Sequence, residues 1–272
     1  METKSEIEER ARPGRWAAVL SLLAVAAVAI SACGDDAGAG GSSATSVVPA
    51  TSAELPQGGE QVDLDPADFT TEITNPYWPL SVGSRWVYRE TDTTGKVERV
   101  VVKVTGKTKT IANGIEALVV RDTTSKDGVP KEVTDDWVAQ DSAGNIWNLG
   151  EDTTKYFHGK PGTRAGSFEA GVDGAEAGIA LPGTPEPGQS YRQEYHKGKA
   201  EDYGAVVSVG EELVGVPAGS YKASEILMTR DLSSIEPTIQ EMKFYARGVG
   251  PVLSVHLDGD GGRAELVNYH AG

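Results

Sequence analysis

The chain has 272 residues, of which 39% are hydrophobic and 24% charged, and its formal net charge is −15. This composition allows a buried core, and the length that remains after an export segment and a linker fits one domain. Recognition of nucleic acid or adsorption to anionic lipid needs clustered Lys and Arg, so the acidic charge argues against both. The single cysteine, Cys33, excludes an intramolecular disulfide and a zinc site built on several thiolates.

Residues 1–32 have the pattern of a removable signal peptide. An uncharged apolar run at residues 16–30 follows Arg12 and Arg15, and it is shorter than the ~20 residues of a membrane-spanning helix. The order apolar, small, small, Cys at residues 30–33 resembles the lipobox of bacterial lipoproteins. This resemblance implies that Cys33 receives a diacylglyceryl lipid, typically with palmitate chains, and becomes the first residue after cleavage. An uncleaved membrane anchor is the alternative.

Residues 33–61 are expected to form the lipidated cysteine and a flexible linker. The stretch from Gly34 to Glu60 is rich in Gly, Ala, Ser and Thr and nearly lacks large apolar side chains. Such a segment cannot bury enough surface to offset the entropy that ordering costs. Residues 62–272 are then expected to form a single β-rich domain on the extracytoplasmic face of the membrane.

The domain sequence alternates with a period of two residues, which predicts strands. Val100, Val102 and Val104 share one face of such a strand. Turn signals at Thr93, Ser125, Ser142 and Asp258 separate consecutive strands. The expected strands are 85–90, 98–104, 115–122, 133–140, 146–149, 190–195, 205–213, 221–230, 239–246, 252–256 and 263–269. The predicted fold is therefore all-β: a strongly curved antiparallel meander or an open barrel.

Two local exceptions interrupt this pattern. Residues 65–69 are expected to make one helical turn. The Gly- and Pro-rich segment from Lys160 to Gly188 predicts a long loop, either a lid over a binding site or a crossing between two halves of the sheet.

Several stretches resemble uncharacterised lipid-anchored proteins secreted by high-GC Gram-positive bacteria. The stretches that carry the resemblance lie at residues 83–88, 136–141, 144–147, 150–152, 169–174, 191–195, 200–202, 216–221 and 244–250. The resemblance implies a secreted β-rich lipoprotein and brings no activity or site residue with it.

Motifs of catalysis and metal binding are missing from the sequence. There is no nucleophile elbow, and the four histidines have no zinc-binding spacing, so we expect no metal and no cofactor. Acids gather at 135–136, 151–152 and 194–202, the last group together with His196. Adjacent strand residues point to opposite faces, so each acid pair can send only one member into a groove. A glycosidase-like site or a solvated hairpin rim remain the two interpretations of these acids.

Aromatic residues on the expected strands offer a candidate ligand site. If they line a concave face they form a pocket for an apolar or sugar ligand, and otherwise they fill the core. The candidate residues are Trp86, Trp137, Trp147, Tyr191 and Tyr245.

Together these features predict a lipid-anchored cell-surface protein that is not an enzyme and binds a ligand or partner. The alternatives are a structural envelope lipoprotein without a ligand and a cell-envelope hydrolase that uses carboxylates. The expected contacts are the membrane, through the covalent lipid, and a small apolar or sugar molecule, with no nucleic acid.

Overall fold

The computed structural model of the protein describes residues 55–257 and 261–272. The expected signal helix and the lipidated Cys33 lie outside the described residues. The described part contains no helix of the length and apolarity that a membrane crossing requires. It is all-β, with two short 3-10 helices, η1 at Pro66–Asp68 and η2 at Ala223–Glu225. The first of these confirms the helical turn expected at residues 65–69.

The long strands lie close to where the period-two pattern predicts them. They are β2 (Arg85–Thr91), β3 (Val97–Thr110), β4 (Glu116–Lys126), β5 (Val129–Asp141), β6 (Ile146–Phe157), β9 (Glu176–Leu181), β10 (Ser190–His196), β11 (Ala200–Val209), β14 (Ile226–Ser233), β15 (Gln240–Ala246), β16 (Gly250–His256) and β17 (Gly262–His270). The short ones are β1 (Phe69–Thr70), β7 (Lys160–Pro161), β8 (Phe168–Glu169), β12 (Val214–Val216) and β13 (Gly219–Tyr221).

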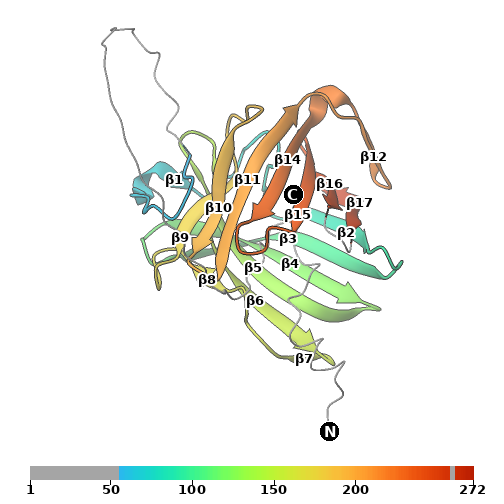
Figure 1. Ribbon diagram of the computed structural model, residues 1–272, viewed down its shortest axis with the longest axis horizontal. Helices are drawn as coiled ribbons and strands as arrows, with labels where there is room; N and C mark the ends of the chain where they lie inside the picture. The colour runs from blue at the N-terminus through green and yellow to red at the C-terminus, as the bar shows by residue number, and fades with distance from the viewer. Residues whose placement is uncertain (1–54, 258–260) are drawn as a thin grey trace, which may run out of the picture.

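The twelve long strands form one antiparallel sheet that closes on itself (Figure 1). The neighbours run β5-β4-β3-β2-β17-β16-β15-β14-β11-β10-β9-β6, and β6 pairs back with β5. The predicted curved meander is confirmed, and its two edges pair with each other in place of staying open. Closure removes the unpaired edge groups that an open sheet would expose.

The register of the strands separates an inner from an outer face. Trp86 opposes Val102, and Val102 opposes Asp122, so these three side chains point to the same side. Around the whole sheet, the inner face is apolar toward one end of the barrel and polar toward the other. Trp86, Val102 and Val104 lie toward the apolar end, where the segment of residues 73–80 inserts Trp78 beside Tyr245 with ring centroids 6.0 Å apart. The other end is lined by polar and charged side chains.

One barrel strand lies in the segment that the sequence predicts to be a loop. Residues 176–181 form β9, which fills the place between β6 and β10. The expectation of irregular structure was wrong here because half of the residues of this strand are Gly or Ala, and the small size of Gly178 is required. A Cβ on Gly178 would lie 2.3 Å from the backbone of Gln193. Part of the 160–188 segment is therefore barrel wall, and it cannot be a lid over its full length.

The last residues of the expected linker contact the outside of β10. The Arg192 side chain is fully buried and donates hydrogen bonds to the carbonyls of Gly58, Glu60 and Ala177. The backbone N–H of Arg192 also donates to the Pro56 carbonyl at 2.6 Å. Contacts with the barrel thus begin several residues before position 62, the expected start of the domain.

Candidate functional site

The polar end of the barrel buries an unusual number of acids. Among the described residues ten acids and two basic residues are buried. Nine of the ten acids occupy inner-face positions of the strands: Glu90, Glu98, Asp122, Glu132, Asp136, Glu151, Glu194, Asp202 and Asp231. The remaining one, Glu265, points outward to Arg89. Buried carboxylates without cations are costly, so the neutralisation of this surface decides what it can do.

Lysines neutralise three places on the inner face. Lys243 on β15 lies between two acids, with its Nζ 2.6 Å from Asp231 Oδ2 and 3.3 Å from Glu241 Oε2. Lys155 Nζ lies 3.5 Å from Glu132 Oε2. At the β2–β3 hairpin, Lys96 Nζ lies 2.7 Å from Glu98 Oε1.

Four of the buried carboxyl groups lie where β5, β6, β10 and β11 meet. Asp136 and Glu151 are Cα partners across β5 and β6, and Glu194 and Asp202 are Cα partners across β10 and β11. Asn148 on β6 donates to Glu194 Oε2 at 3.4 Å, and the charge of Glu151 acts on Glu194 from the neighbouring pair. We call Asp136, Glu151, Glu194 and Asp202 the four-carboxyl cluster. All four side chains are at least nine-tenths buried.

Burial and mutual repulsion favour the protonated form of these acids. Burial, followed by the charge of Glu151, raises the pKa of Asp136 well above its ordinary value. Burial, followed by Asp202 and Glu151, does the same to the pKa of Glu194. Burial raises the pKa of Asp202 to about 6, a rise that contacts with Glu194 and Ser233 limit. Each pair can therefore hold protons at pH values where exposed carboxyl groups have lost theirs.

The same shift occurs outside the cluster at Asp122 on β4. Burial raises the pKa of this carboxyl group to about 8, and the charge of Glu132 adds to the rise. At neutral pH Asp122 is therefore protonated in the folded protein.

Within residues 55–257 and 261–272, several buried polar atoms on the inner face have no hydrogen-bond partner. Each belongs to a side chain that is less than 5% exposed. These atoms are Asp122 Oδ2, Thr124 Oγ1, Asp136 Oδ2, Tyr191 OH and Gln193 Oε1. Buried polar groups in folded proteins almost always find a partner in protein, water or ligand.

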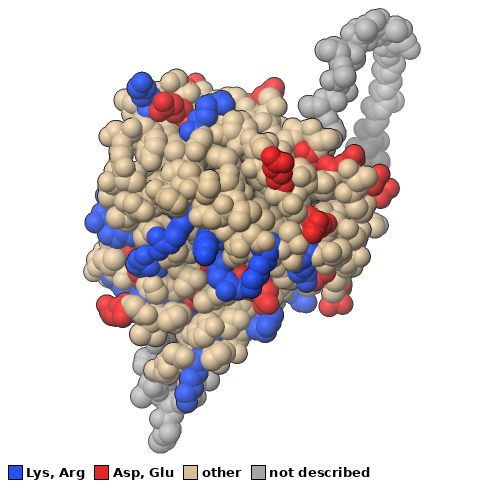
Figure 2. Space-filling view, turned by 180° about the vertical axis from the view of Figure 1, so that it is seen from behind, with Lys and Arg blue, Asp and Glu red and all other residues tan. Residues whose placement is uncertain are grey.

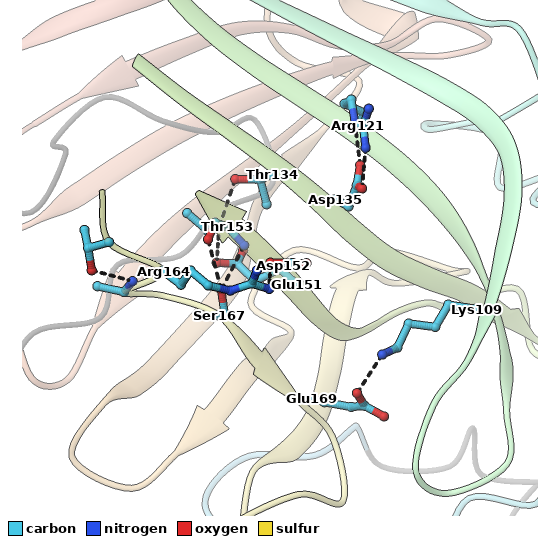
Figure 3. A network of polar contacts seen from close by, with 12 residues as sticks. Lys109, Arg121, Thr134, Asp135, Glu151, Asp152, Thr153, Arg164, Ser167 and Glu169 are labelled. Carbon is cyan, nitrogen blue, oxygen red and sulfur yellow. Dashed lines mark hydrogen bonds and ion pairs between the residues drawn. The ribbon is translucent and has the colours of Figure 1, made fainter. Parts of the chain in front are cut away.

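Side chains on a strand point alternately to the two faces of the sheet. The acids next in sequence to the inward acids therefore lie on the outer face. Asp135 accepts two hydrogen bonds from Arg121, and Asp152 accepts one from Arg164, whereas Glu151 accepts from Thr153 Oγ1 at 2.9 Å (Figure 3). Of each acid pair in the sequence, one member thus enters the barrel and one stays outside.

The five aromatic residues of the predicted pocket divide between the two faces. Trp86, Tyr191 and Tyr245 point inward. Trp86 donates to the Val249 carbonyl at 2.7 Å, so its polar atom is used within the fold. Trp137 lies on the outer face, where Lys109 Nζ sits 3.8 Å from its ring centroid. Trp147 is also on the outer face, donates to Asp141 Oδ2 at 2.8 Å and meets Phe69 edge-on. The five side chains therefore do not all face the same side of the barrel wall.

In the part of the chain that the structure describes, a histidine ion pair joins His256 to Glu241, outside the four-carboxyl cluster. His196 lies at the end of β10, and burial, with the charge of Lys199, lowers its pKa. Within the described residues no group of three or more His, Cys, Asp or Glu has the arrangement of a metal site.

The sequence does indicate the acidic inner face, although the aromatic pattern favoured a different site. Glu98 stands two residues before Val100, and Asp122 two residues after Val120, so each acid is in phase with core-facing valines. Such an acid is expected inside the barrel. On the face shown in Figure 2, Lys and Arg side chains lie across the middle of the molecule, with Asp and Glu among and around them.

No protein-family model and no curated protein matches the chain. Solved structures that resemble it include one from Bacteroides fragilis, described as a "putative exported protein with YMCC-like fold". It shares 14% identity over 73% of this chain and 100% of its own, with a TM-score of 0.42. Another, a "putative lipoprotein" from Parabacteroides distasonis, shares 15% identity over 72% of this chain and 99% of its own, with a TM-score of 0.33. At these TM-scores the function has to be inferred from the chain's own residues.

Proposed function

We propose that this chain is a lipid-anchored protein of the extracytoplasmic membrane face whose barrel binds a small polar molecule without transforming it. Lipid anchoring is supported by the lipobox-like residues 30–33 and the apolar run before them. Binding is supported by one observation: buried polar atoms without partners gather on the inner face of a twelve-stranded barrel.

This observation favours binding over a purely structural role. A barrel selected only for stability would fill its interior with apolar side chains, because buried polar groups without partners cost about 1–3 kcal/mol each. The apolar end, closed by Trp78, has that character. The polar end has the opposite one, and its unpartnered atoms Asp136 Oδ2 and Gln193 Oε1 are suited to receive donors from a ligand.

The placement of the acids also favours binding over glycoside hydrolysis. A glycosidase needs two carboxyl groups on either side of the bond to be cut, about 5–9.5 Å apart. Asp136 and Glu151 are direct cross-strand partners, as are Glu194 and Asp202. The two members of each pair therefore approach a ligand from the same side.

Thermal unfolding of the full chain, followed by tryptophan fluorescence, tests the proposal. The probes are putrescine, trehalose and 1-decanol, which represent a cationic, a neutral polar and an apolar ligand. A ligand at 100 times its dissociation constant stabilises by about 2.7 kcal/mol, so binding appears as a saturable rise in melting temperature. The rise should occur with a polar probe and shrink in Asp136→Asn but not in the outward control Asp135→Asn. No saturable rise with either polar probe would contradict the binding role and favour a structural lipoprotein.

A further inference from the structure

Basic residues lie side by side on the outer face of β2, β3 and β4. Arg85 and Lys103 are Cα partners across β2 and β3, and Lys103 and Arg121 are Cα partners across β3 and β4. Four residues further along the strands, Arg89 and Arg99 are partners in the same way. The outward row between them contains Val87, Val101 and Thr123. We call Arg85, Arg89, Arg99, Lys103 and Arg121 the basic wall.

The pairing of these residues works against the stability of the sheet. Directly opposed side chains on neighbouring strands have Cβ atoms about 4.5–5.5 Å apart, and like charges at that distance repel. An acid opposite each base would be more stable, as the two hydrogen bonds from Arg121 to Asp135 on β5 illustrate. Three basic pairs in adjoining positions therefore indicate a counter-charge that comes from outside the barrel.

Much of the positive charge of the basic wall is uncompensated. Two of its members pair with acids at its margins: Arg89 with Glu265 on β17 at 2.7 Å, and Arg121 with Asp135 on β5. The other three, Arg85, Arg99 and Lys103, take part in none of the ion pairs within residues 55–257 and 261–272. Arg99 and Lys103 are exposed and Arg85 is half-buried. The basic wall thus presents cationic groups to its surroundings.

The net charge of −15 conceals this wall, because the acids and bases occupy different faces of the sheet. Nine of the buried acids point into the barrel, whereas the basic wall points out. Salt screens charges beyond a Debye length, about 8 Å at physiological ionic strength. A partner that touches the outside of β2, β3 and β4 therefore meets mainly the bases.

We propose that the basic wall docks the barrel on the anionic headgroups of the membrane to which the chain is attached. This inference rests on the proposed lipid anchor and adds a second contact with the membrane. Guanidinium groups suit this contact because they bind phosphate oxygens with paired hydrogen bonds. An anionic lipid surface improves binding about fivefold for each nearby Lys or Arg, hence about a hundredfold for Arg85, Arg99 and Lys103 together.

The length of the chain before the barrel allows this orientation. Leu55 stands 22 residues after Cys33, and a chain of that length spans at most about 75 Å. The chain meets the barrel at β10, where the Arg192 N–H donates to the Pro56 carbonyl, and β10 is nearly opposite β3 in the strand order. Half the circumference of twelve tilted strands is about 30–40 Å. The anchor can therefore reach the bilayer while the basic wall lies on it.

Energy transfer from tryptophan to a dansyl-labelled lipid tests this inference. The full chain is reconstituted through its own anchor into vesicles of phosphatidylcholine alone, or with 30% phosphatidylglycerol. The anchor is the same in both vesicles, so a difference in transfer reports the position of the barrel. Trp86 on β2 and Trp137 on β5 lie within or beside the strands of the basic wall. We expect about twofold more transfer in the anionic vesicles at 0.1 M salt and equal transfer at 1 M salt, where the Debye length is about 3 Å.

A charge-removing variant locates the contact on the basic wall. The triple variant Arg85→Gln, Arg99→Gln and Lys103→Gln should abolish the excess transfer in anionic vesicles at 0.1 M salt. It should not lower the stability to urea, because it removes like-charge pairs. A role of these side chains in the fold alone would have the opposite signature, with lower stability and unchanged transfer.

A matched control removes three exposed lysines from other parts of the barrel. The variant Lys197→Gln, Lys199→Gln and Lys222→Gln changes the net charge by the same amount at the β10–β11 turn and beside η2, and it should keep the excess transfer. Loss of the excess in this control, or its persistence in the basic-wall variant, would overturn the inference.

Two outcomes with the unaltered chain also decide the question. Equal transfer in both vesicles at 0.1 M salt would overturn docking, and saturable binding of inorganic polyphosphate would then assign the basic wall to a soluble polyanion. Flotation with the neutral vesicles measures the anchor separately. A chain that does not float would overturn both the anchor and the docking, whereas equal transfer from a chain that floats would overturn the docking alone.

Discussion

Replacing Asp122 by Asn should make the protein more stable, and increasingly so as the pH rises. The carboxyl group has a pKa of about 8 in the folded protein, against 3.8 in the unfolded chain. Between these values the folded state holds a proton that the unfolded state has released. Stability of the wild type therefore falls as the pH rises through this window.

The size of the effect follows from the shift. Each pKa unit corresponds to about 1.4 kcal/mol, so the window from pH 5 to pH 8 removes about 4 kcal/mol of unfolding free energy through this one group. An amide does not titrate and resembles the protonated acid in shape. The stability of Asp122→Asn relative to wild type should therefore increase by about 4 kcal/mol over the same window.

Urea unfolding at 25 °C, monitored by tryptophan fluorescence at pH 5, 6, 7 and 8, measures this difference. The control, Asp135→Asn, lies on the outer face beside Arg121 and should show no comparable growth with pH. Glu132→Gln should reduce the pH dependence of the wild type, because the charge of Glu132 contributes to the raised pKa. A stability difference for Asp122→Asn that stays constant from pH 5 to pH 8 would refute the reasoning and place Asp122 in a solvated, ionised state.

Three further predictions test the anchor, the outer face and the barrel wall. Cys33→Ala should release the protein from the membrane fraction or stall its processing, and unchanged membrane association with unchanged mass would contradict lipidation. Trp147→Ala should lower the free energy of unfolding by about 3–5 kcal/mol, because Trp147 packs on Phe69. It should leave the affinity for a polar probe unchanged well below the melting temperature; a loss of affinity would indicate that Trp147 belongs to the ligand site. Gly178→Ala should cost about 1–3 kcal/mol in urea unfolding, since its Cβ would meet the Gln193 backbone. Gly215→Ala, whose Cβ would lie 3.9 Å from Ser220 Oγ in ordinary contact, should be close to neutral; equal effects would argue against a tight β9–β10 contact.

Local sequence patterns were enough to predict most of the strands. Alternation around Val100, Val102 and Val104 identifies a half-buried strand because side chains on a strand point to alternate faces. Turn residues add the hairpins: Asp127 and Gly128, at the β4–β5 turn, both have positive φ, which few residues other than Gly, Asn and Asp adopt easily. The same alternation implies that Asp135 and Asp136 must face opposite sides.

The period-two pattern failed to predict structure where a tertiary contact determines which residue types a strand contains. The strand β9 has few bulky residues, because Gly178 must let the Gln193 backbone approach. Its sequence does not show the alternation of apolar and polar residues that predicts a strand. The aromatic hypothesis faced the same limit. Period two tells that Trp86 and Trp137 each occupy one face of a strand, but only the register across the sheet assigns them to opposite sides of the wall.

What the sequence by itself determined is therefore the all-β class, the position of most strands and the one-in, one-out division of each acid pair, because these depend on neighbours along the chain. Which member of a pair enters the barrel, and which acids then meet, depends on strand order and register, since Asp136 and Glu194 lie far apart in the sequence and on different hairpins. Closure of β6 onto β5 and the insertion of β9 bring their strands together. The tertiary structure alone thus converts scattered acids into the four-carboxyl cluster, and burial there gives them chemistry that no local pattern contains.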